Sequence, residues 1–317
     1  QSPNCISYAV FCLKKKKMER KIELKDVSID DKNTFYEYYA KYPVMHCDYN
    51  FSNLIFYGDI YRYQWFTFED HLVIYNPVKD LIFMPVGEPY NLDFLKEISD
   101  IFKNSDKSGN FCFCSNDFIA ANPDLSFYFD VIEDRSCANY IYKTDKLANL
   151  AGRDLHGKRN LISQFIKNYP ENETFETEKI KMDCENFRSC VELAKKWLNN
   201  KGEVDETMQI ELHILEKICK YVKDLDLGLV VLKVKAQIVA FSIFSRQTKE
   251  MATVHFEKFD VDYAGAPQMI NKKTAMFLLN KYKYINREDD LGLESLRRSK
   301  LSYKPDILLT VNLLKRK

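Results

Sequence analysis

The sequence predicts an α+β protein of two similar domains in tandem, each a mixed, mostly antiparallel sheet flanked by helices. The chain has 317 residues, of which 46% are hydrophobic and 14% aromatic, so it can build about two well-filled cores. The same order of predicted strands and helices also occurs twice along the chain. An internal repeat of this length allows each copy to bury its own sheet.

The second half shows the repeated order most clearly. Its strands are short apolar runs, and its helices carry apolar residues three and four positions apart. Short turns join the three central strands, which predicts an antiparallel meander. The predicted elements are strand Glu173–Lys181, a helix capped by Asp183, a helix over Met208–Val222, strands Gly228–Val234, Ile238–Arg246 and Ala252–Lys258, helix Gln268–Lys281, strand Tyr284–Asn286, helix Leu293–Lys300 and strand Ile307–Leu314.

The first half has the same order of elements. Its one ambiguous segment is Phe51–Tyr57, which suits either a short helix or a strand. The other predicted elements are strand Lys21–Val27, helix Asp30–Tyr42, strands Gln64–Phe68, Leu72–Tyr75 and Leu81–Pro85, helix Leu92–Phe102, strand Phe111–Cys114, helix Asn116–Ala121 and strand Phe127–Ile132. We therefore expect an N-terminal domain over residues 18–139 and a C-terminal domain over 140–317, preceded by a disordered extension, 1–17.

Composition excludes several classes of protein. The net charge of +1 gives no global field for nucleic acid, so a phosphate contact needs a local basic patch. Cys112 and Cys114 lack the partners of a zinc site and predict buried free thiols on one face of a strand, so no metal is predicted. Scattered thiols suit the cytoplasm, and no apolar stretch is long enough to span a membrane. Two basic patches are Arg153, Lys158, Arg159 and Lys167, and Arg287, Arg297, Arg298, Lys300 and Lys304.

The loop before helix Gln268–Lys281 is a candidate anion site. The free N–H groups at a helix start can bind a phosphate or pyrophosphate, and here Gly265 precedes the helix while Lys272 lies in its first turns. The corresponding loop of the first half has no basic residue, so the C-terminal copy is the better candidate. The loop lacks the Gln/Arg-x-x-Gly-x-Gly/Ala pattern of acyl-CoA-binding members of such folds. Either CoA binds poorly or the donor differs.

The preceding strand carries the candidate catalytic residues His255 and Glu257. They are two positions apart, so we expect them on one face of the strand, where either could take a proton from an attacking amine or hydroxyl. The alternative is an ordinary salt-bridged strand end. The sequence contains no Gly-x-Ser-x-Gly, P-loop or His-Glu-x-x-His motif, which argues against a serine hydrolase, a nucleotide hydrolase and a zinc protease.

The densest polar cluster begins where strand Tyr284–Asn286 ends. Arg287 can bind a carboxylate or phosphate through two parallel hydrogen bonds, at the sheet edge where α/β folds tend to bind ligands. An Asp-rich N-capping turn explains Asp289 or Asp290 equally well, but it does not explain Arg287. The cluster predicts a binding site made of Asn286, Arg287, Glu288, Lys300 and Tyr303, joined by Lys158 and Arg159.

Three segments carry a family resemblance. They are Gly152–Phe165 (GRDLHGKRNLISQF), Val254–Lys258 (VHFEK) and Asn286–Tyr303 (NREDDLGLESLRRSKLSY), which Lys304-Pro305 follows. With them, nearly the whole chain after Met18 resembles the family named for the C-terminal domain of phosphatidylglycerol lysyltransferases. The resemblance implies a tandem GNAT-like acyltransferase fold and a place near the transferases that depend on aminoacyl-tRNA.

The leading hypothesis is transfer of an activated acyl or aminoacyl group to an amine or hydroxyl acceptor, such as a lipid or a peptide. Glu257 or His255 would assist deprotonation, and Arg287, Lys300, Lys158 and Arg159 would neutralise donor phosphates. The donor would be aminoacyl-tRNA, bound by its acceptor end. The alternatives are a CoA-dependent N-acyltransferase and a catalytically silent binding protein of the same fold.

Overall fold

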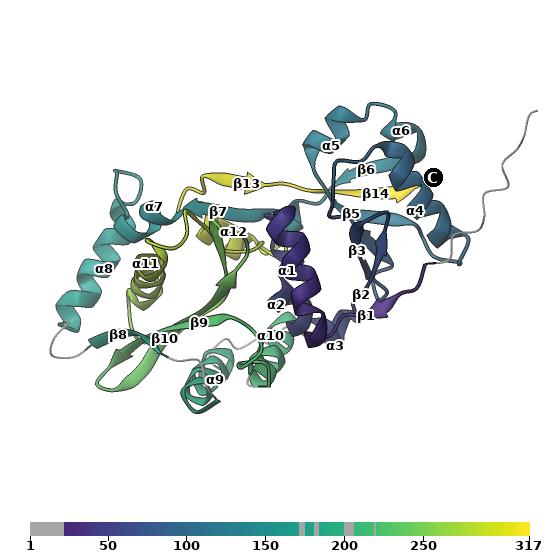
Figure 1. Ribbon diagram of the computed structural model, residues 1–317. Coiled ribbons are helices and arrows are strands. Elements are labelled where there is room, and N and C mark those ends of the chain that lie inside the picture. Colours follow the sequence, from purple (N-terminus) through teal and green to yellow (C-terminus); the bar gives the residue numbers. More distant parts are fainter. Residues whose placement is uncertain (1–21, 171–174, 181–183, 200–205, 219) are drawn as a thin grey trace, which may run out of the picture.

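The computed structural model describes residues 22–170, 175–180, 184–199, 206–218 and 220–317. They form two seven-stranded sheets, one in each half of the molecule, with helices packed on their faces (Figure 1). The predicted fold class, two mixed sheets flanked by helices, is confirmed. Residues 1–17 and the predicted cap Asp183 lie outside the described part.

The first sheet has the strand order β1-β2-β3-β4-β5-β14-β6. Helices α1 (Lys32–Lys41), α2 (Phe51–Phe56) and α3 (Gly58–Tyr61) follow β1, and α4 (Leu92–Lys103), α5 (Asn116–Ala121) and α6 (Leu125–Tyr128) occur later. The ambiguous segment Phe51–Tyr57 is therefore a helix. The strands are β1 (Lys25–Asp26), β2 (Gln64–Phe68), β3 (His71–Asn76), β4 (Leu81–Phe83), β5 (Asn110–Cys114), β6 (Phe129–Glu133) and β14 (Asn312–Arg316).

Alternation along these strands fills two cores, one on each face of the first sheet. Ile82 packs with the apolar face of α4, whereas its neighbour Phe83 packs on the other face with Phe35 of α1 and Phe51 of α2. The rings of Phe35 and Phe51 lie 5.3 Å apart. Successive side chains on a strand point to opposite faces, so one short strand supplies both cores.

The second sheet has the order β13-β7-β12-β11-β10-β9-β8. Helices α9 (Cys184–Asn199) and α10 (Glu206–Ile218) cover one face, and α7 (Thr144–Asn149), α8 (His156–Asn168) and α11 (Ala266–Leu278) cover the other. Helix α12 (Glu294–Leu301) follows β12. The strands are β7 (Asn139–Lys143), β8 (Phe175–Ile180), β9 (Leu227–Val234), β10 (Gln237–Arg246), β11 (Met251–Phe259), β12 (Tyr284–Asn286) and β13 (Ile307–Leu309).

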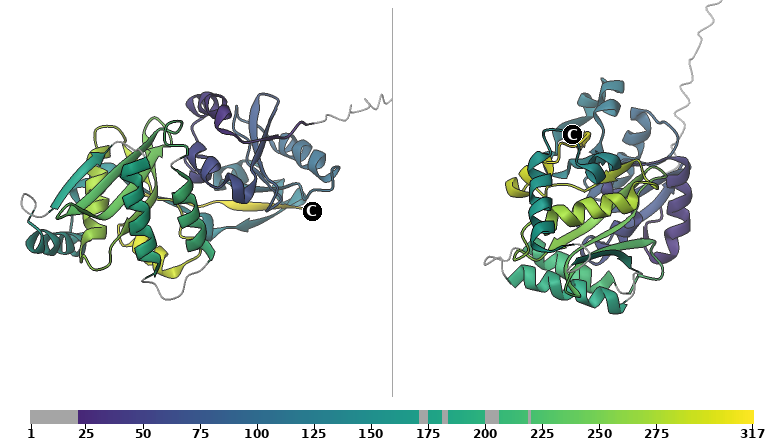
Figure 2. Two further views of the ribbon diagram at one scale, coloured as in Figure 1. Left: turned by 90° about the horizontal axis from the view of Figure 1, so that it is seen from below. Right: turned by 90° about the vertical axis from the view of Figure 1, so that its left-hand side faces the viewer.

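Each sheet contains one strand that reaches it from the other side of the molecule. In chain order β7 follows β6 but lies between β12 and β13, and β14 follows β13 but lies between β5 and β6. Both crossing segments are visible in Figures 1 and 2. The prediction that Ile307–Leu314 is a single strand is wrong, because the chain pairs with β7 and then leaves for the first sheet. The domain boundary near residue 140 stays a prediction.

The second sheet opens between β11 and β12. These two strands are parallel and pair at Met251–Tyr284, Ala252–Ile285 and Thr253–Asn286. Beyond Asn286 the chain bonds to β7, where Tyr140 accepts from the N–H of Arg287, while β11 continues beside β10 to Phe259. The two strands therefore part after their third pair, and the residues that follow on each side face a gap in the sheet.

Because β14 crosses into the first sheet, we expect alanine substitutions of two nearby leucines to lower the free energy of unfolding by different amounts. Leu314 of β14 is fully buried in a core of the first sheet, whereas Leu308 of β13 is 37% exposed. Leu314→Ala should lower the free energy of unfolding by about 2–5 kcal/mol, the usual effect of a buried leucine, and Leu308→Ala by about 0.5 kcal/mol or less. Urea denaturation measures both changes. Equal losses would show that β14 contributes nothing to the first core.

Candidate functional site

Glu257 and Arg287 face each other across the gap between β11 and β12. Arg287 Nη2 donates to Glu257 Oε1 at 2.9 Å, and each of the two side chains is 13% exposed. Asn271 of α11 donates to the other carboxylate oxygen of Glu257, at 3.3 Å. The pair therefore lies on the face of the sheet that α8 and α11 cover, where the sequence placed a ligand site.

Aromatic rings and a second cation surround the Arg287 guanidinium. Its central carbon lies 5.0 Å from the ring centre of Tyr303 and 5.9 Å from that of Tyr142, and Lys158 Nζ of α8 lies 4.4 Å from Tyr303. Burial, together with the nearby Arg287 charge, lowers the pKa of Lys158. Glu257 balances only one of the two cations, so the cluster of Lys158, Glu257, Arg287 and Tyr303 carries a net positive charge.

Two buried polar atoms at this cluster have no hydrogen-bond partner among the described residues. One is Nη1 of Arg287, a donor, and the other is Oδ1 of Asn271, an acceptor. A buried polar group left without a partner costs on the order of 1–3 kcal/mol. Such a pair of atoms suits a ligand that brings both an acceptor and a donor.

His255 lies on the opposite face from Glu257, so the prediction that they share one face is wrong. The pairing of β10 with β11 shifts between Ile243 and Phe244, which leaves His255 as the extra residue of a β-bulge. A bulge inserts one residue and reverses the alternation beyond it. His255 consequently points toward α2 of the first domain, with its ring centre 5.5 Å from that of Phe56.

His255 stands between Ser245 and Glu288. Its Nε2 lies 2.8 Å from Ser245 Oγ and its Nδ1 lies 3.0 Å from Glu288 Oε1. The sequence of contacts, serine to histidine to carboxylate, is that of a catalytic triad with a serine nucleophile. The Ser245 hydroxyl, however, donates its proton to Asn50 Oδ1 at 3.1 Å. That oxygen is an acceptor, because it also accepts from the backbone N–H of Ser52 and so caps α2. Asn53 donates to Glu288 from the same helix. This group joins the two domains.

Asn286 and Lys300 hold the loop that carries Arg287. Asn286 donates to Asn139 Oδ1 at 2.8 Å and to the carbonyl of Met45, and its own oxygen accepts from the N–H of Glu288. Lys300 Nζ donates to the carbonyls of Arg287, at 2.6 Å, and of Asp289. Burial lowers the pKa of Lys300. The sequence predicted that Asn286 and Lys300 bind a ligand, but these hydrogen bonds of both side chains are made to the protein itself.

Asp290 anchors the end of the same loop. The carboxylate is fully buried and accepts hydrogen bonds from Arg135, Arg297 and Tyr140. Burial alone would raise its pKa, but the bonds from Arg297 and Tyr140 lower the pKa of Asp290 to about 2. The sequence left open that Asp290 only caps a helix in an Asp-rich turn. In the structure it also binds two arginines and a tyrosine.

The start of α11 is closed by α8. Gly265 precedes α11 in the left-handed region (φ 89°), and a Cβ atom there would lie 2.3 Å from the carbonyl oxygen of Leu161. Asp260 and Asp262, both bonded to Lys196, make the adjoining loop acidic. These features disfavour the pyrophosphate that the sequence placed here.

Two other predicted residues lie away from the cluster around Arg287. Lys272 lies in the middle of α11 rather than at its start. Arg159 donates to the carbonyls of Leu150 and Gly152 and so fixes the turn between α7 and α8.

The matching gap of the first sheet, between β4 and β5, is filled by side chains. Tyr49 donates to the carbonyl of Met84 at 2.9 Å, and the rings of Tyr49 and Phe113 each lie about 5 Å from Phe83. Phe113 has a positive φ of 66°, which interrupts the alternation of β5. Cys112 and Cys114 are buried and free, as predicted, but they pack in different cores rather than on one face.

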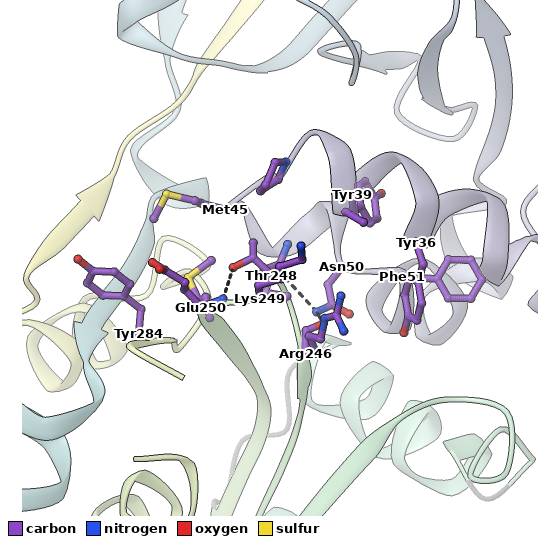
Figure 3. Close-up of a pocket in the computed structure, with 14 residues that line it drawn as sticks. Tyr36, Tyr39, Met45, Asn50, Phe51, Arg246, Thr248, Lys249, Glu250 and Tyr284 are labelled. Carbon is purple, nitrogen blue, oxygen red and sulfur yellow. Dashed lines mark hydrogen bonds between the residues drawn. The ribbon is translucent and has the colours of Figure 1, made fainter. Parts of the chain in front are cut away.

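A pocket of about 400 Å³ lies between the domains, beside the turn that joins β10 and β11. Tyr36, Tyr39 and Phe51 line one side, and Arg246 and Glu250 are among the residues on the other (Figure 3). None of the site residues that the sequence predicts lines this pocket.

The helices of the described residues include none with the length and the apolar composition that a membrane span requires.

The model of the family "Phosphatidylglycerol lysyltransferase, C-terminal" matches residues 39–311. The chain belongs to this family. The match covers most of both domains, including β11, β12 and α12, and it gives the chain an acyl- or aminoacyl-transferase-type fold. The resemblance seen in the sequence is thereby confirmed.

Three similar proteins extend this result. A curated protein of Mycoplasmoides gallisepticum, MYCGA3080, is 28% identical over 243 residues, which are 76% of this chain and 77% of its own. A conserved protein of unknown function from Bacteroides thetaiotaomicron is 30% identical with a TM-score of 0.85, covering 94% of this chain and 100% of its own. L-PGS from Bacillus licheniformis is 17% identical with a TM-score of 0.58, covering 90% and 92%, and shows the shared fold.

The site residues that the sequence missed are those without a local signal. Tyr142 and Asn271 join the Arg287 cluster, and Ser245 and Asn53 join His255, from elements that only the folded chain brings together. The apolar spacing of α11 could have placed Asn271 on its buried face, but nothing in the sequence indicates the bulge at His255.

The closed start of α11 predicts different effects for two glycine substitutions. Gly265→Ala should lower the free energy of unfolding by about 2–4 kcal/mol, because alanine adds left-handed strain and a clash with Leu161. Gly157→Ala in α8 meets open space and should be neutral or slightly stabilising. Thermal or urea unfolding measures both. A tolerated Gly265→Ala would mean that α11 and α8 are not in contact here.

Proposed function

We propose that this protein transfers an activated aminoacyl group to an amine or hydroxyl acceptor in the gap between β11 and β12. The observation that carries the proposal is the buried Nη1 of Arg287, at the point where the strands part. It has no hydrogen-bond partner in the part of the chain that the structure describes. Family membership supports the reaction class, and the contacts around Arg287 support the place.

The positive charge of the cluster suits the donor's phosphates. An Arg287 guanidinium can hold Glu257 with one nitrogen and a phosphate or carbonyl oxygen with the other, and Lys158 adds a second cation. Tyr142 and Tyr303 form aromatic walls around the guanidinium. Partial burial strengthens such contacts, because the local dielectric constant is lower than that of water.

An aminoacyl donor fits better than a plain acyl donor. Besides the free donor of Arg287, the site has a free acceptor, Asn271 Oδ1, beside the Glu257 carboxylate. The α-ammonium group of an amino acid would donate a hydrogen bond to Asn271 Oδ1 and lie next to the negatively charged carboxylate of Glu257. An acetyl group has no donor to offer there, so it would leave Asn271 Oδ1 without a partner.

The reaction follows from this placement. The lone pair of the acceptor nitrogen or oxygen attacks the ester carbonyl carbon, and the bond from that carbon to the ribose oxygen breaks. Glu257 takes the acceptor's proton and passes it to the leaving ribose oxygen, so no net proton is consumed. Arg287 stabilises the negative charge on the carbonyl oxygen, and holding both reactants together supplies much of the rate.

CoA is the alternative donor, and the start of α11 argues against it. The pyrophosphate of CoA would need the N–H groups at a helix start, but α8 packs on Gly265 and the adjoining loop is acidic. A donor that places its phosphates beside Lys158 and Arg287 avoids this obstacle. An aminoacyl-tRNA donor also implies action in the cytoplasm, where such donors are made.

The test uses Arg287→Lys, which keeps the charge but loses the forked contact. Charged and uncharged tRNA, acetyl-CoA and CoA are titrated against the full chain. We expect binding of charged tRNA only, weakened about 5- to 150-fold by the substitution, the equivalent of ~1–3 kcal/mol for a charge-assisted hydrogen bond. Arg298→Lys is the matched control, because Arg298 of α12 is 75% exposed.

A second readout separates binding from stability. Arg287→Lys should leave the melting temperature within a few degrees of the parent value, and transfer of a labelled amino acid to a primary amine should fall with donor affinity. If the substitution lowers the melting temperature but leaves affinity per folded molecule unchanged, Arg287 is only a structural clamp on Glu257. Tight binding of acetyl-CoA would favour the CoA alternative.

A further inference from the structure

His46, Cys47 and Asp48 bring three different ligand atoms to one point at the junction of the domains. His46 Nδ1 lies 3.2 Å from Asp48 Oδ2, Cys47 Sγ lies 3.7 Å from the same oxygen, and all three atoms lie within 4.8 Å of one another. They belong to the short turn before α2 that fills the gap of the first sheet. The acyl-transfer proposal uses none of them.

The hydrogen bonds of His46 decide which ring nitrogen is free. Nε2 lies 2.9 Å from the carbonyl oxygen of Cys137, which can only accept, and 3.3 Å from the amide nitrogen of Asn139, which can only donate. The shorter contact, to Cys137, favours a proton on Nε2. Nδ1 accepts one long bond, 3.4 Å, from the N–H of Asp48. With the proton on Nε2, the lone pair of Nδ1 also faces Asp48 Oδ2, 3.2 Å away. Both atoms are then hydrogen-bond acceptors, and they repel each other. Either a proton or a metal ion between the two atoms would remove this repulsion.

The three ligand atoms also have the spacing that a metal ion requires. A second proton on His46 would make an ion pair with Asp48, and the Cys47 thiol could donate to the same carboxylate oxygen at 3.7 Å. A metal ion would instead bind all three ligand atoms at once. Zinc ligands lie about 2.0–2.3 Å from the ion, so tetrahedral neighbours are separated by about 3.2–3.8 Å. The separation of His46 Nδ1 from Asp48 Oδ2, 3.2 Å, and that of Cys47 Sγ from the same oxygen, 3.7 Å, fall in that range. Nitrogen, thiolate and carboxylate together favour zinc over magnesium or calcium.

The surroundings already hold the ligands in place. The carbonyl of Cys137 orients the imidazole through the nitrogen that would not bind metal, the usual arrangement at a metal-binding histidine. Asn139 accepts from the N–H of Cys47 at 2.7 Å, and the ring of Phe113 lies 4.3 Å from that of His46. The Asp48 side chain is 30% exposed, which leaves a route for an ion to enter.

We propose that a zinc-like divalent cation binds His46 Nδ1, Cys47 Sγ and the Asp48 carboxylate, and that it stabilises the junction between the two sheets. Binding replaces the thiol proton of Cys47, which is released to solvent, and a water molecule completes a tetrahedral set. The site is structural in this proposal: it fixes the turn that closes the first sheet's gap and bonds to Asn139 of the second sheet.

The test titrates Co²⁺ and then Zn²⁺ into the full chain after treatment with a chelator. We expect one Co²⁺ per chain, with the visible bands of tetrahedral cobalt and a thiolate-to-cobalt charge-transfer band, both abolished when Zn²⁺ displaces it. Cys47→Ser should abolish the charge-transfer band, and His46→Gln should weaken binding about tenfold or more. Cys114→Ser and the exposed His156→Gln are the controls and should leave the titration unchanged.

Asp48→Asn is the decisive variant if either of the first two fails to fold. Its side chain is partly exposed, so the far-ultraviolet circular dichroism should stay as in the parent while Co²⁺ affinity falls about tenfold or more. Unchanged affinity in Asp48→Asn, a charge-transfer band that survives in Cys47→Ser, or no tetrahedral spectrum in the parent would each overturn the proposal. In that event His46 and Asp48 form an ordinary ion pair.

Discussion

The hydrogen bond between the side-chain amides of Asn286 and Asn139 determines where the second sheet opens. Both residues are fully buried, Asn139 at the start of β7 and Asn286 at the end of β12. A buried amide without partners is destabilising, so each must be satisfied inside the protein. Asn139 also accepts from Cys47, and Asn286 donates to Met45, which fastens the turn between the domains to the same point.

The position of Arg287 follows from this bond. With Asn286 held against β7, the next residue can bond to Tyr140 rather than to β11, and its side chain reaches back across the gap to Glu257. On the other face, Glu288 reaches back to His255 and to α2 of the first domain. The first domain thus contributes no ligand-binding residue to the gap in this account. It supports the edge of the gap instead.

Much of the fold could be predicted from the sequence, because apolar periodicity and turn residues act locally. The pairing of Arg287 with Glu257 was also predictable, since it needs only the order of neighbouring strands. What could not be predicted depends on long-range or irregular geometry. Residues two apart on a strand were expected to share a face. The bulge at His255 and the left-handed backbone of Phe113 made that expectation wrong for His255 with Glu257 and for Cys112 with Cys114. The departure of β14 to the first sheet has no local signal in the sequence.

The central claim is that the donor binds where β11 and β12 part. The most direct measurement is a crystal structure with a stable amide analogue of an aminoacylated tRNA acceptor end. We predict the analogue's carbonyl or phosphate oxygen within hydrogen-bond distance of Arg287 Nη1, and its ammonium group beside Asn271 Oδ1 and Glu257. An analogue bound instead at the start of α11, or in the pocket beside Arg246, with the Arg287–Glu257 pair unchanged, would contradict the account.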